Sequence, residues 1–352
     1  MLRNYLKRRS LYKLKSEMKT AIIILNWNGA DVTIDCLRSL RDADGDFFVV
    51  VADNGSHDGS PEKIAGWLSE ERMPFRMVAE GAETGVVCDC GDILLYRMNS
   101  NYGFAKGNNR AIALAMGSSP DNILLLNNDT VVNKDFLVRL LQFRDRHPEY
   151  KVLTPLINFY FDKELVWNAG GNLRYGFRKY NYNHRKAAEI KESEYIDISF
   201  ITGCALLVPV ALLDGDRRIF TERFFFGEED FEFSIRMAKA GVKIACVLDS
   251  LIYHKVGTSL SEERNTPGKI YINYLNRFID VRLHYSKLFF AVWRIVYAPY
   301  IALLLRKKGC KAAEIKSFIS RLYRESSVKD GVTYEDFKRA LSQDWCGKEM
   351  TV

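Results

Sequence analysis

The stretch "NILLLNNDTVV", from Asn122 to Val132, decides how this chain folds. It begins with an apolar run and then turns polar at Asn127, Asn128 and Asp129. A short apolar run that ends abruptly in polar residues is typical of a strand buried inside a parallel sheet. We therefore expect a central strand here, with the polar residues at its carboxyl end.

Two earlier runs have the same character, and helical patterns separate the three. The strands are expected at Ala21–Trp27 and Phe47–Asp53, and the helices at Val32–Leu40, Pro61–Leu68 and Phe104–Met116. This alternation predicts an α/β fold with a Rossmann-like, mostly parallel sheet. Ligands of such sheets bind beyond the carboxyl ends of the strands, which is where this sequence becomes polar.

Length and cysteine usage limit the class of protein. The chain has 352 residues, of which 47% are hydrophobic, enough for one large α/β domain with an extension or for two modest domains. Its seven cysteines include no C-x-x-C pair, and Cys88 and Cys90 flank a single Asp. That spacing suits neither a disulfide framework nor a zinc module, so we expect reduced cysteines and a cytoplasmic protein.

Residues 1–19 form a basic arm, with seven Lys or Arg against the lone Glu17. The arm lacks the apolar core of a secretory signal. It could lie on an anionic membrane surface or, as a solvated helix, pack on the body or on another subunit of a homo-oligomer. Nucleic acid is not an expected partner, because no reading helix or stacking sheet follows the arm.

The remaining chain divides into segments of different composition. We expect a hairpin over Met77–Asn99, and short antiparallel strands over 158–200 that form a small lobe on the acceptor side. Tyr271–Leu305 is helical and aromatic, and from Leu288 onward it contains only Arg294 as a charge. It could be an in-plane amphipathic helix or a packed core helix; Arg294 and Pro299 make a membrane span less favourable.

Two soluble helices are expected after Lys311. The predicted domains are the arm at 1–19, an α/β domain at 20–265, and a C-terminal helical extension at 266–352 that could associate with a membrane.

Two segments near the strand ends could contact a ligand. Asp53 could accept hydrogen bonds from a base or ribose, although an Asx turn is the alternative, which we favour for Asp58. The segment "NSNYGFAKGNNRAI", residues 99–112, opens a helix. Its Gly103 and Gly107 would let the backbone approach a ligand near the helix N-terminus.

Three groups of residues could carry chemistry. Asp129 is a hard oxygen ligand suited to Mg²⁺ or Mn²⁺, unless it caps a helix beginning near Lys134. His254, at the end of a short strand, could complete such a metal shell or contact a phosphate. In "FFFGEEDFEF", Glu229 and Asp230 lie at a helix start, where aromatic walls and neighbouring acids can raise the pKa of a general base. A favourable helix dipole is the alternative explanation.

Taken in order, these segments resemble a family-two glycosyltransferase of the GT-A fold, of the bacterial rhamnosyltransferase-like kind. The resemblance covers roughly Ala21 to Asn276. It is carried by "IIILNWNG", "VADNGSHDGS", "NYGFAKGNN", "LLLNNDT", "WNAGG", "TGCALLV", "GEEDFEFSIR" and "YHKVGTS".

The resemblance implies a role for each matching residue. Asn26, Trp27 and Asn28 would line the nucleotide cleft with Gly103, and Asp53 would receive the base. Asn127–Asp129 stands where the family has its D-x-D motif, so Asp129 would hold the metal; Asn128 would shape the turn, and Asn127 departs from the usual acid. Asp230 would be the catalytic base with Glu229 as neighbour or substitute, and His254 would lie near the diphosphate or its metal.

The implied reaction is transfer of a sugar, with inversion, from a dTDP-, UDP- or GDP-linked donor, assisted by Mg²⁺ or Mn²⁺. The acceptor would be a glycan or a lipid-linked molecule in cell-surface polysaccharide synthesis, at the inner face of the membrane. Two alternatives stay open. One is a nucleotidyltransferase, although "LNWNGADVT" lacks a phosphate loop rich in Gly and Lys. The other is a nucleotide-sugar-binding or scaffolding module that has lost turnover.

Overall fold

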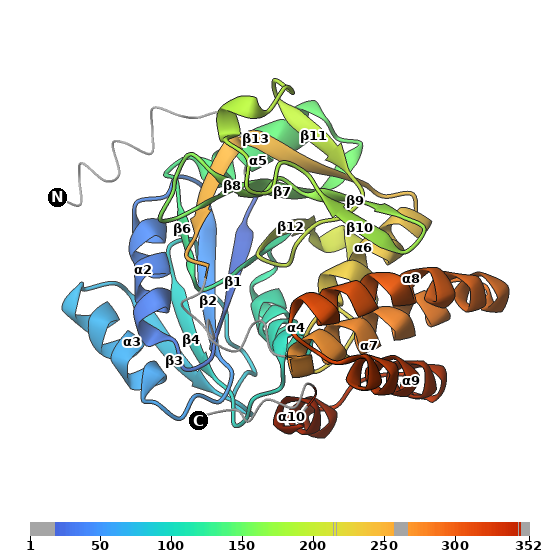
Figure 1. The fold of residues 1–352 in the computed structure, drawn as a ribbon. Coiled ribbons are helices and arrows are strands. Elements are labelled where there is room, and N and C mark those ends of the chain that lie inside the picture. The colour runs from blue at the N-terminus through green and yellow to red at the C-terminus, as the bar shows by residue number, and fades with distance from the viewer. Residues whose placement is uncertain (1–17, 214, 216, 257–266, 344, 346–352) are drawn as a thin grey trace.

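A computed structural model describes residues 18–213, 215, 217–256, 267–343 and 345 (Figure 1). The expectations for the basic arm therefore lie outside the described residues, apart from its last two positions. The described chain forms one large mixed sheet with helices on both faces and a group of C-terminal helices to one side.

Five parallel strands form the first half of the sheet. Their spatial order is β3 (Phe75–Ala79), β4 (Ile93–Arg97), β2 (Phe47–Asp53), β1 (Thr20–Asn26) and β5 (Asn122–Leu126). The pairs β1–β2, β1–β5, β2–β4 and β3–β4 are all parallel. The three apolar runs expected to be parallel strands are thus confirmed.

The hairpin expected over Met77–Asn99 is wrong. β3 and β4 run in the same direction, with Phe75 opposite Ile93 and Ala79 opposite Arg97. Parallel neighbours need a connection of about a dozen residues or more, and residues 80–92 supply it. Turn-forming residues in this segment therefore belong to a long crossover between parallel strands and not to a tight turn.

The second half of the sheet is mixed. Beyond β5 follow β12 (Ala205–Pro209), β7 (Tyr150–Phe159), β13 (Lys243–His254) and β11 (Tyr195–Ile198). β12 is antiparallel to both β5 and β7, β13 is parallel to β7, and β11 is antiparallel to β13. Two short strands attach here, β6 (Thr130–Val132) to β13 and β8 (Val166–Asn168) to β7.

A separate hairpin of β9 (Gly171–Arg174) and β10 (Phe177–Tyr180) lies beside the sheet. The short antiparallel strands expected between 158 and 200 are therefore present. Three short 3-10 helices connect elements elsewhere: η1 (Met116–Ser118), η2 (Ala187–Glu189) and η3 (Val210–Leu212).

Helices cover both faces of the sheet, which explains why its central strands are apolar throughout. Alternate β1 side chains point to opposite faces: Ile22 and Ile24 pack with α2 (Ala30–Arg41), α3 (Ser60–Glu70) and α5 (Phe136–Arg146). Ala21 and Ile23 pack on the other face, towards α4 (Phe104–Ala115) and α6 (Glu229–Lys239). The three helices expected between the strands are confirmed as α2, α3 and α4.

The C-terminal helices form a third hydrophobic cluster. They are α7 (Pro267–His284), α8 (Lys287–Lys307), α9 (Ala312–Val328) and α10 (Tyr334–Ser342), and the last two confirm the expected pair. Helix α6 joins this cluster to the sheet, because Phe231 and Ile235 pack on the C-terminal helices while Phe233 and Met237 pack on the sheet. Helix α6 is thus packed between the sheet and the C-terminal helices.

The aromatic run from Tyr271 to Leu305 is not one helix. It divides at Tyr285 and Ser286, where the hydroxyl of Ser286 accepts a 3.2 Å hydrogen bond from the Phe289 amide and caps α8. Among the described residues, α8 is the one helix that is long and apolar enough to cross a membrane by length and composition. Its inner face packs on α7 and α9 (Figure 1).

Candidate functional site

The strand order creates a crevice at the centre of the sheet. From β1 the chain adds β2 and β4 on one side and then returns to place β5 on the other. Loops that leave the carboxyl ends of such strands diverge, which opens a ligand site between them. The segments at this point are Asn26–Gly29, after β1, and Asn127–Asp129, after β5.

The first two polar strand ends are bonded to each other. The side-chain amide of Asn26 donates a 2.7 Å hydrogen bond to Asp53 Oδ1, and the Thr33 hydroxyl donates to Asn26 Oδ1 at 2.8 Å. Asp53 Oδ2 accepts from the Ser56 amide at 3.0 Å, an Asx-type turn. Both residues are almost fully buried, so their first role here is to hold two loops together. Base recognition by Asp53 stays a prediction.

Trp27 and Asn28 are more accessible. The ring of Trp27 is 37% exposed, and Asn28 adopts a left-handed conformation with φ of 49°. The Asn28 amide donates to the Ser56 hydroxyl at 2.9 Å, and its side-chain oxygen accepts from the His57 amide at 3.0 Å. Asn28 thereby fixes the loop after β1 against the loop after β2. As expected, Asp58 forms a local turn, accepting from the Ser60 amide at 3.0 Å.

Gly103 is closely packed within the protein, and its expected approach to a ligand stays a prediction. With φ of +80°, its Cα lies so near Phe225 that an added Cβ would be 2.0 Å from the carbonyl oxygen of Phe225. That same oxygen accepts a 3.1 Å hydrogen bond from the Phe104 amide. Gly107 likewise faces Leu25 and Asn54. These glycines permit close packing within the protein, and they bring the segment before α6 to the sheet edge.

Asp129 and His254 meet because β6 turns back along β13. The antiparallel register places Thr130 opposite His254, and Asp129 Oδ1 lies 2.9 Å from His254 Nε2. Both side chains are 2% exposed. The alternative role of Asp129 as a helix cap is wrong, because β6 follows it and α5 begins later, after Asp135. The sequence correctly placed His254 at a strand end, although the strand is long.

Asp129 and His254 by themselves supply only some of the ligands that a divalent metal ion needs. Within the described ranges, no group of three or more His, Cys, Asp or Glu side chains is arranged to hold a metal ion. A carboxylate and an imidazole whose facing atoms, Asp129 Oδ1 and His254 Nε2, lie 2.9 Å apart do fit Mg²⁺ or Mn²⁺ if a bound phosphate and water complete the shell. The rings of Trp167 and His254 meet edge to face, with their centroids 4.2 Å apart, and this contact limits rotation of the imidazole.

The polar residues that precede Asp129 are held by their neighbours. The Asn127 amide donates to the carbonyl oxygen of Cys204 at 2.8 Å, and the Asn128 side chain donates to the Thr33 hydroxyl at 3.0 Å. Asn128 therefore shapes the turn against α2, as expected. Asn127 stands where the D-x-D motif has an acid. Among the contacts described for this turn, no other carboxylate takes the place of that acid.

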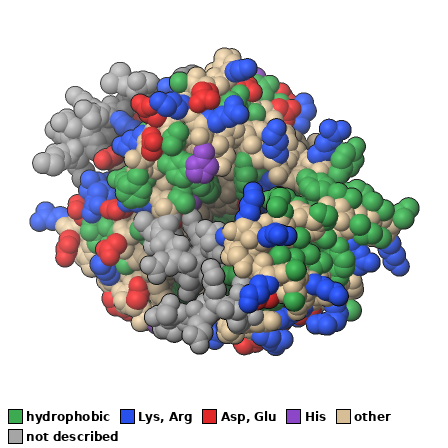
Figure 2. All heavy atoms as spheres, in the orientation of Figure 1, with side chains coloured by type: hydrophobic (Ala, Val, Ile, Leu, Met, Phe, Trp, Pro, Cys, Tyr) green, Lys and Arg blue, Asp and Glu red, His purple; other side chains and the backbone are tan. Residues whose placement is uncertain are grey.

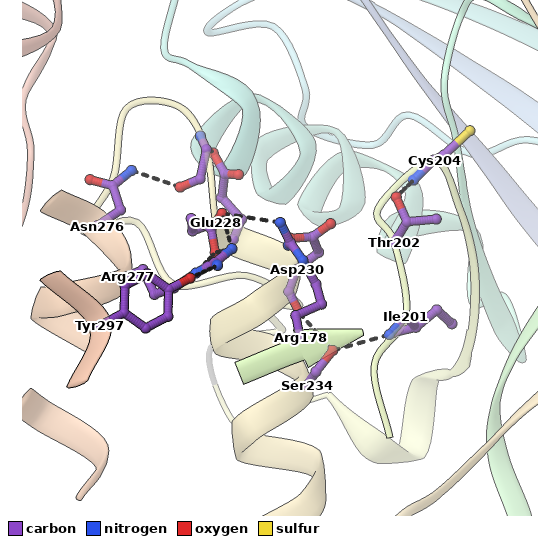
Figure 3. A network of polar contacts seen from close by, with 12 residues as sticks. Arg178, Ile201, Thr202, Cys204, Glu228, Asp230, Ser234, Asn276, Arg277 and Tyr297 are labelled. Carbon is purple, nitrogen blue, oxygen red and sulfur yellow. Dashed lines mark hydrogen bonds and ion pairs between the residues drawn. The ribbon is translucent and has the colours of Figure 1, made fainter. Parts of the chain in front are cut away.

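The acidic cluster at the start of α6 is organised by two arginines (Figure 3). Arg277, from α7, forms a two-pronged ion pair with Glu228, with N–O distances of 2.7 and 2.9 Å, and donates to the Tyr297 hydroxyl at 2.7 Å. Arg178, from β10, lies 3.4 Å from Glu228 and 3.8 Å from Asp230. Burial favours a raised pKa for Glu228, but the two guanidiniums outweigh it and hold this pKa below its ordinary value.

The two following acids differ in accessibility and in protonation. Burial raises the pKa of Glu229 to about 8. The negative charges of Asp230 and Glu228 act in the same direction, and hydrogen bonds from the Glu229 and Gly227 backbone amides oppose the rise. Burial raises the pKa of Asp230 to about 6, and Arg178 opposes that rise. The Asp230 side chain is 24% exposed while Glu229 is buried. At neutral pH Asp230 is the ionised and accessible acid, and Glu229 is protonated.

A short segment links this cluster to the Asp129 loop. The Ser234 hydroxyl donates to the Asp230 carbonyl oxygen at 2.7 Å and accepts from the Ile201 amide at 3.2 Å. Three residues later, Cys204 binds Asn127 through its carbonyl group. Ile201, Thr202 and Cys204 pass beside α6 in Figure 3. The segment just before β12 therefore joins the two candidate reaction centres, the acids at the start of α6 and the Asp129 loop.

The functional residues that sequence reasoning missed are Arg178, Arg277 and Tyr297. Arg178 is one of many charged residues in an irregular segment, and Arg277 lies in the middle of an aromatic helix. Nothing in their local sequence indicates that they meet at Glu228. Arg277 lies in the middle of a long apolar pattern and is buried. A charge in such a pattern indicates an internal ion pair, and this was the one sequence feature that could have suggested the contact.

Two family models match the chain. Glycosyl transferase family 2 matches residues 21–214, and Glycosyl transferase family group 2 matches residues 122–313. A curated relative, the uncharacterized glycosyltransferase YfnE of Bacillus subtilis (strain 168), is 24% identical over 195 residues, which are 52% of this chain and 43% of the relative. The chain thus spans less than half the length of that relative.

Two solved structures resemble the fold. The mannosyltransferase PcManGT from Pyrobaculum calidifontis, in complex with GDP-Man and Mn²⁺, has 13% identity and a TM-score of 0.51, covering 94% of this chain and 93% of that one. GalNAc-T7, with UDP, GalNAc and Mn²⁺, has 12% identity and a TM-score of 0.57, covering 92% of this chain and 56% of that one. The expected GT-A fold is confirmed.

We predict that Arg277→Met lowers the free energy of unfolding by about 3–5 kcal/mol, because the buried Glu228 carboxylate loses the guanidinium that forms its two-pronged ion pair. Urea unfolding followed by circular dichroism measures this. In the double variant Arg277→Met with Glu228→Gln the buried charge is gone, so part of the loss should be recovered. Equal destabilisation in the single and double variants would contradict the ion-pair explanation.

Proposed function

Because the chain belongs to glycosyltransferase family 2, we propose that it transfers a sugar from a nucleotide-sugar donor to a hydroxyl group of an acceptor. The observation that carries this proposal is Asp230: an accessible carboxylate at the start of α6, ionised near neutral pH, with Arg178 beside it. A base with a pKa near the working pH is the most effective at removing a proton from an attacking hydroxyl.

The proposed reaction is a single displacement. Asp230 accepts the proton of the acceptor hydroxyl as its oxygen forms a bond to the anomeric carbon of the sugar. The bond from that carbon to the diphosphate oxygen breaks, and its electron pair leaves with the nucleoside diphosphate. One displacement inverts the anomeric configuration, and no covalent glycosyl-enzyme intermediate is required, unlike in retaining hydrolases that use paired carboxylates.

Two residues are proposed to hold a divalent cation together with the donor diphosphate. Asp129 supplies a carboxylate and His254 an imidazole, and their 2.9 Å separation at adjoining strand ends supports a shared ligand. Mg²⁺ or Mn²⁺ bound there would neutralise negative charge on the departing diphosphate. The two similar structures that hold Mn²⁺ support this proposal by analogy of fold.

The donor cleft is proposed to lie along the ends of β1 and β2. Trp27 is exposed enough to contact a base or ribose, Asn28 shapes the loop that carries it, and the buried Asn26–Asp53 pair supports both. Gly103 acts by packing the next loop against the segment that leads to Asp230. The proposed donors are UDP-, dTDP- or GDP-linked hexoses or rhamnose, because the sequences of the loops around the cleft do not indicate which sugar is bound.

We further propose that the acceptor is a glycan or a lipid-linked molecule used in cell-surface polysaccharide synthesis. The place of reaction would be the cytoplasmic face of the inner membrane. The composition of the chain supports this location. The formal net charge is +7, residues 1–19 contain seven Lys or Arg and a single Glu, and a C-terminal helix is highly apolar.

Asp230→Asn should lower the rate of sugar transfer about 10²- to 10⁴-fold, because Asn cannot accept the proton. Binding of the donor should change little. Product formation is measured with radiolabelled donor, and donor binding by isothermal calorimetry. Full activity in Asp230→Asn would disprove its role as base, while donor binding without turnover in the unmodified chain would favour a binding module.

The matched control is Glu229→Gln. Because Glu229 is buried and protonated at neutral pH, Gln reproduces its charge and can still accept the hydrogen bond from the Gly227 amide. The transfer rate should fall less than about tenfold. A loss as large as that of Asp230→Asn would move the base to Glu229.

The rate of transfer should rise with pH through about 6, since Asp230 must lose its proton before it can act as base. Removing the Arg178 guanidinium, which lowers this pKa, should move the acid limb to higher pH in Arg178→Gln. The control is Arg174→Gln on the same hairpin, whose guanidinium lies over Tyr175. A pH–rate profile that is the same in all three proteins would refute the electrostatic role of Arg178.

Asp129→Asn should weaken Mn²⁺-dependent nucleotide binding by about tenfold, because a neutral amide is a poorer ligand for a hard cation. Thermal stabilisation by UDP, GDP or dTDP, with Mn²⁺ or with EDTA, measures this and also identifies the nucleotide. Asp135→Asn is the control, since this exposed acid pairs with Arg139 at the start of α5. Unchanged Mn²⁺ dependence in Asp129→Asn would exclude Asp129 as a metal ligand.

A further inference from the structure

Helix α8 is apolar on both of its faces, and only one of them is covered. The inner face consists of Phe290, Trp293, Tyr297, Ile301 and Leu305, which are buried against the other C-terminal helices. On the opposite face six apolar side chains, each at least 55% exposed, recur at helical spacing: Leu288, Val292, Ile295, Val296, Tyr300 and Leu303. A surface helix of a globular protein normally presents polar residues there.

The exposed face forms a continuous patch. Figure 2 shows hydrophobic side chains gathered on the right of the molecule, over the position of α8 in Figure 1, with Lys and Arg side chains at the margins. Single exposed apolar residues are ordinary, but contiguous patches mark surfaces that contact a partner or a membrane. We refer to the six side chains as the α8 patch.

The charges of α8 and of the residues that directly follow it are all of one sign. Between Lys287 and Lys311 the sequence contains six basic residues and no acid. Lys287 lies at one end of the helix, while Arg306 and Lys307 are exposed at the other. The remaining charge within the helix, Arg294, is turned towards α9, with its guanidinium over the rings of Phe290 and Tyr323. The patch itself is thus uncharged and has cations at both ends.

This arrangement fits the surface of an anionic lipid bilayer. Apolar side chains enter the boundary between headgroups and acyl chains, and flanking Lys and Arg side chains attract anionic headgroups. An acidic protein partner would satisfy the cations but would not require a broad uncharged aliphatic face. A second copy of the chain would place the two sets of cations in the same interface without any acid on α8 to pair with them.

The inner face of α8 is bonded to the rest of the protein, which favours a position along a membrane over one that crosses it. The Tyr297 hydroxyl accepts a hydrogen bond from Arg277, which is paired with Glu228 at the start of α6. The Tyr323 hydroxyl on α9 donates to the carbonyl oxygen of Arg294 at 2.7 Å. A spanning helix would break these contacts and would take the Tyr297 hydroxyl away from the buried Arg277 guanidinium.

We propose that the α8 patch docks the protein onto an anionic phospholipid membrane, with α8 in the plane of the interface. Docking requires no turnover and no bound donor. The same helix is connected through Tyr297, Arg277 and Glu228 to the segment that carries Asp230. The docked helix is thus linked to the segment that holds the candidate base, which suits a lipid-linked acceptor; this last step alone rests on the proposed function.

The test measures binding of the full chain to sedimented vesicles. Vesicles of phosphatidylcholine with about 30% phosphatidylglycerol should bind the protein, and pure phosphatidylcholine vesicles should bind it less. In the double variant Val292→Glu and Val296→Glu, binding to the anionic vesicles should be about tenfold weaker. Both positions are exposed, so the fold should persist, and an unchanged thermal midpoint of unfolding checks this.

The matched control makes the same two substitutions at exposed valines elsewhere, Val87→Glu and Val328→Glu, and adds the same charge. It should bind the vesicles almost as well as the unmodified chain. Equal weakening in both double variants, or none in the α8 variant, would overturn the proposal. So would sedimentation equilibrium showing a dimer that only the α8 substitutions dissociate, without vesicle binding by the unmodified chain. Because donor binding and transfer are assayed separately in detergent-free solution, failure of docking is distinguishable from failure of the transferase function.

Discussion

The buried ion pair between Glu228 and Arg277 is the interaction on which the site depends. Glu228 has a left-handed conformation, φ 69°, at the start of α6, and its carboxylate is almost completely removed from water. A buried carboxylate is costly unless it is paired and fully hydrogen-bonded. Arg277 from α7 and Arg178 from β10 meet that requirement, and in doing so they fix three elements that are distant in the sequence.

The consequences of this pairing extend in two directions. Towards the sheet, Arg178 also lies beside Asp230, so the group that neutralises Glu228 keeps the pKa of the neighbouring acid from rising further. Towards the surface, Arg277 donates to Tyr297 and holds the inner face of α8 against the body. The chemistry of the cleft and the orientation of the exposed apolar helix therefore share one electrostatic constraint.

Much of the fold could be predicted from the sequence, and for a clear reason. Strands buried on both faces must be apolar throughout, so the runs at β1, β2 and β5 are distinctive, and the polar residues at their ends mark the ligand edge. The prediction failed over Met77–Asn99, where β3 and β4 run parallel. Turn-rich composition does not distinguish a hairpin from a long crossover, because strand direction is decided by which neighbour completes the sheet. The expected site residues lie at strand and helix ends. Asn26, Asp53 and Gly103 also hold loops together, and their contacts with a ligand stay a prediction.

By itself, the sequence determined the α/β class, the family resemblance and the residues that can carry chemistry, since these follow from local composition and motif order. Only the tertiary structure decided which acid at the start of α6 is ionised. Glu229 and Asp230 are adjacent and chemically similar. Burial raises both pKa values, but that of Asp230 rises less because its side chain is partly accessible and lies beside the Arg178 guanidinium. It also decided that Asp129 meets His254, through the pairing of β6 with β13, and that one face of α8 stays uncovered. Burial and long-range pairing set these properties, and neither is encoded in any local stretch of the chain.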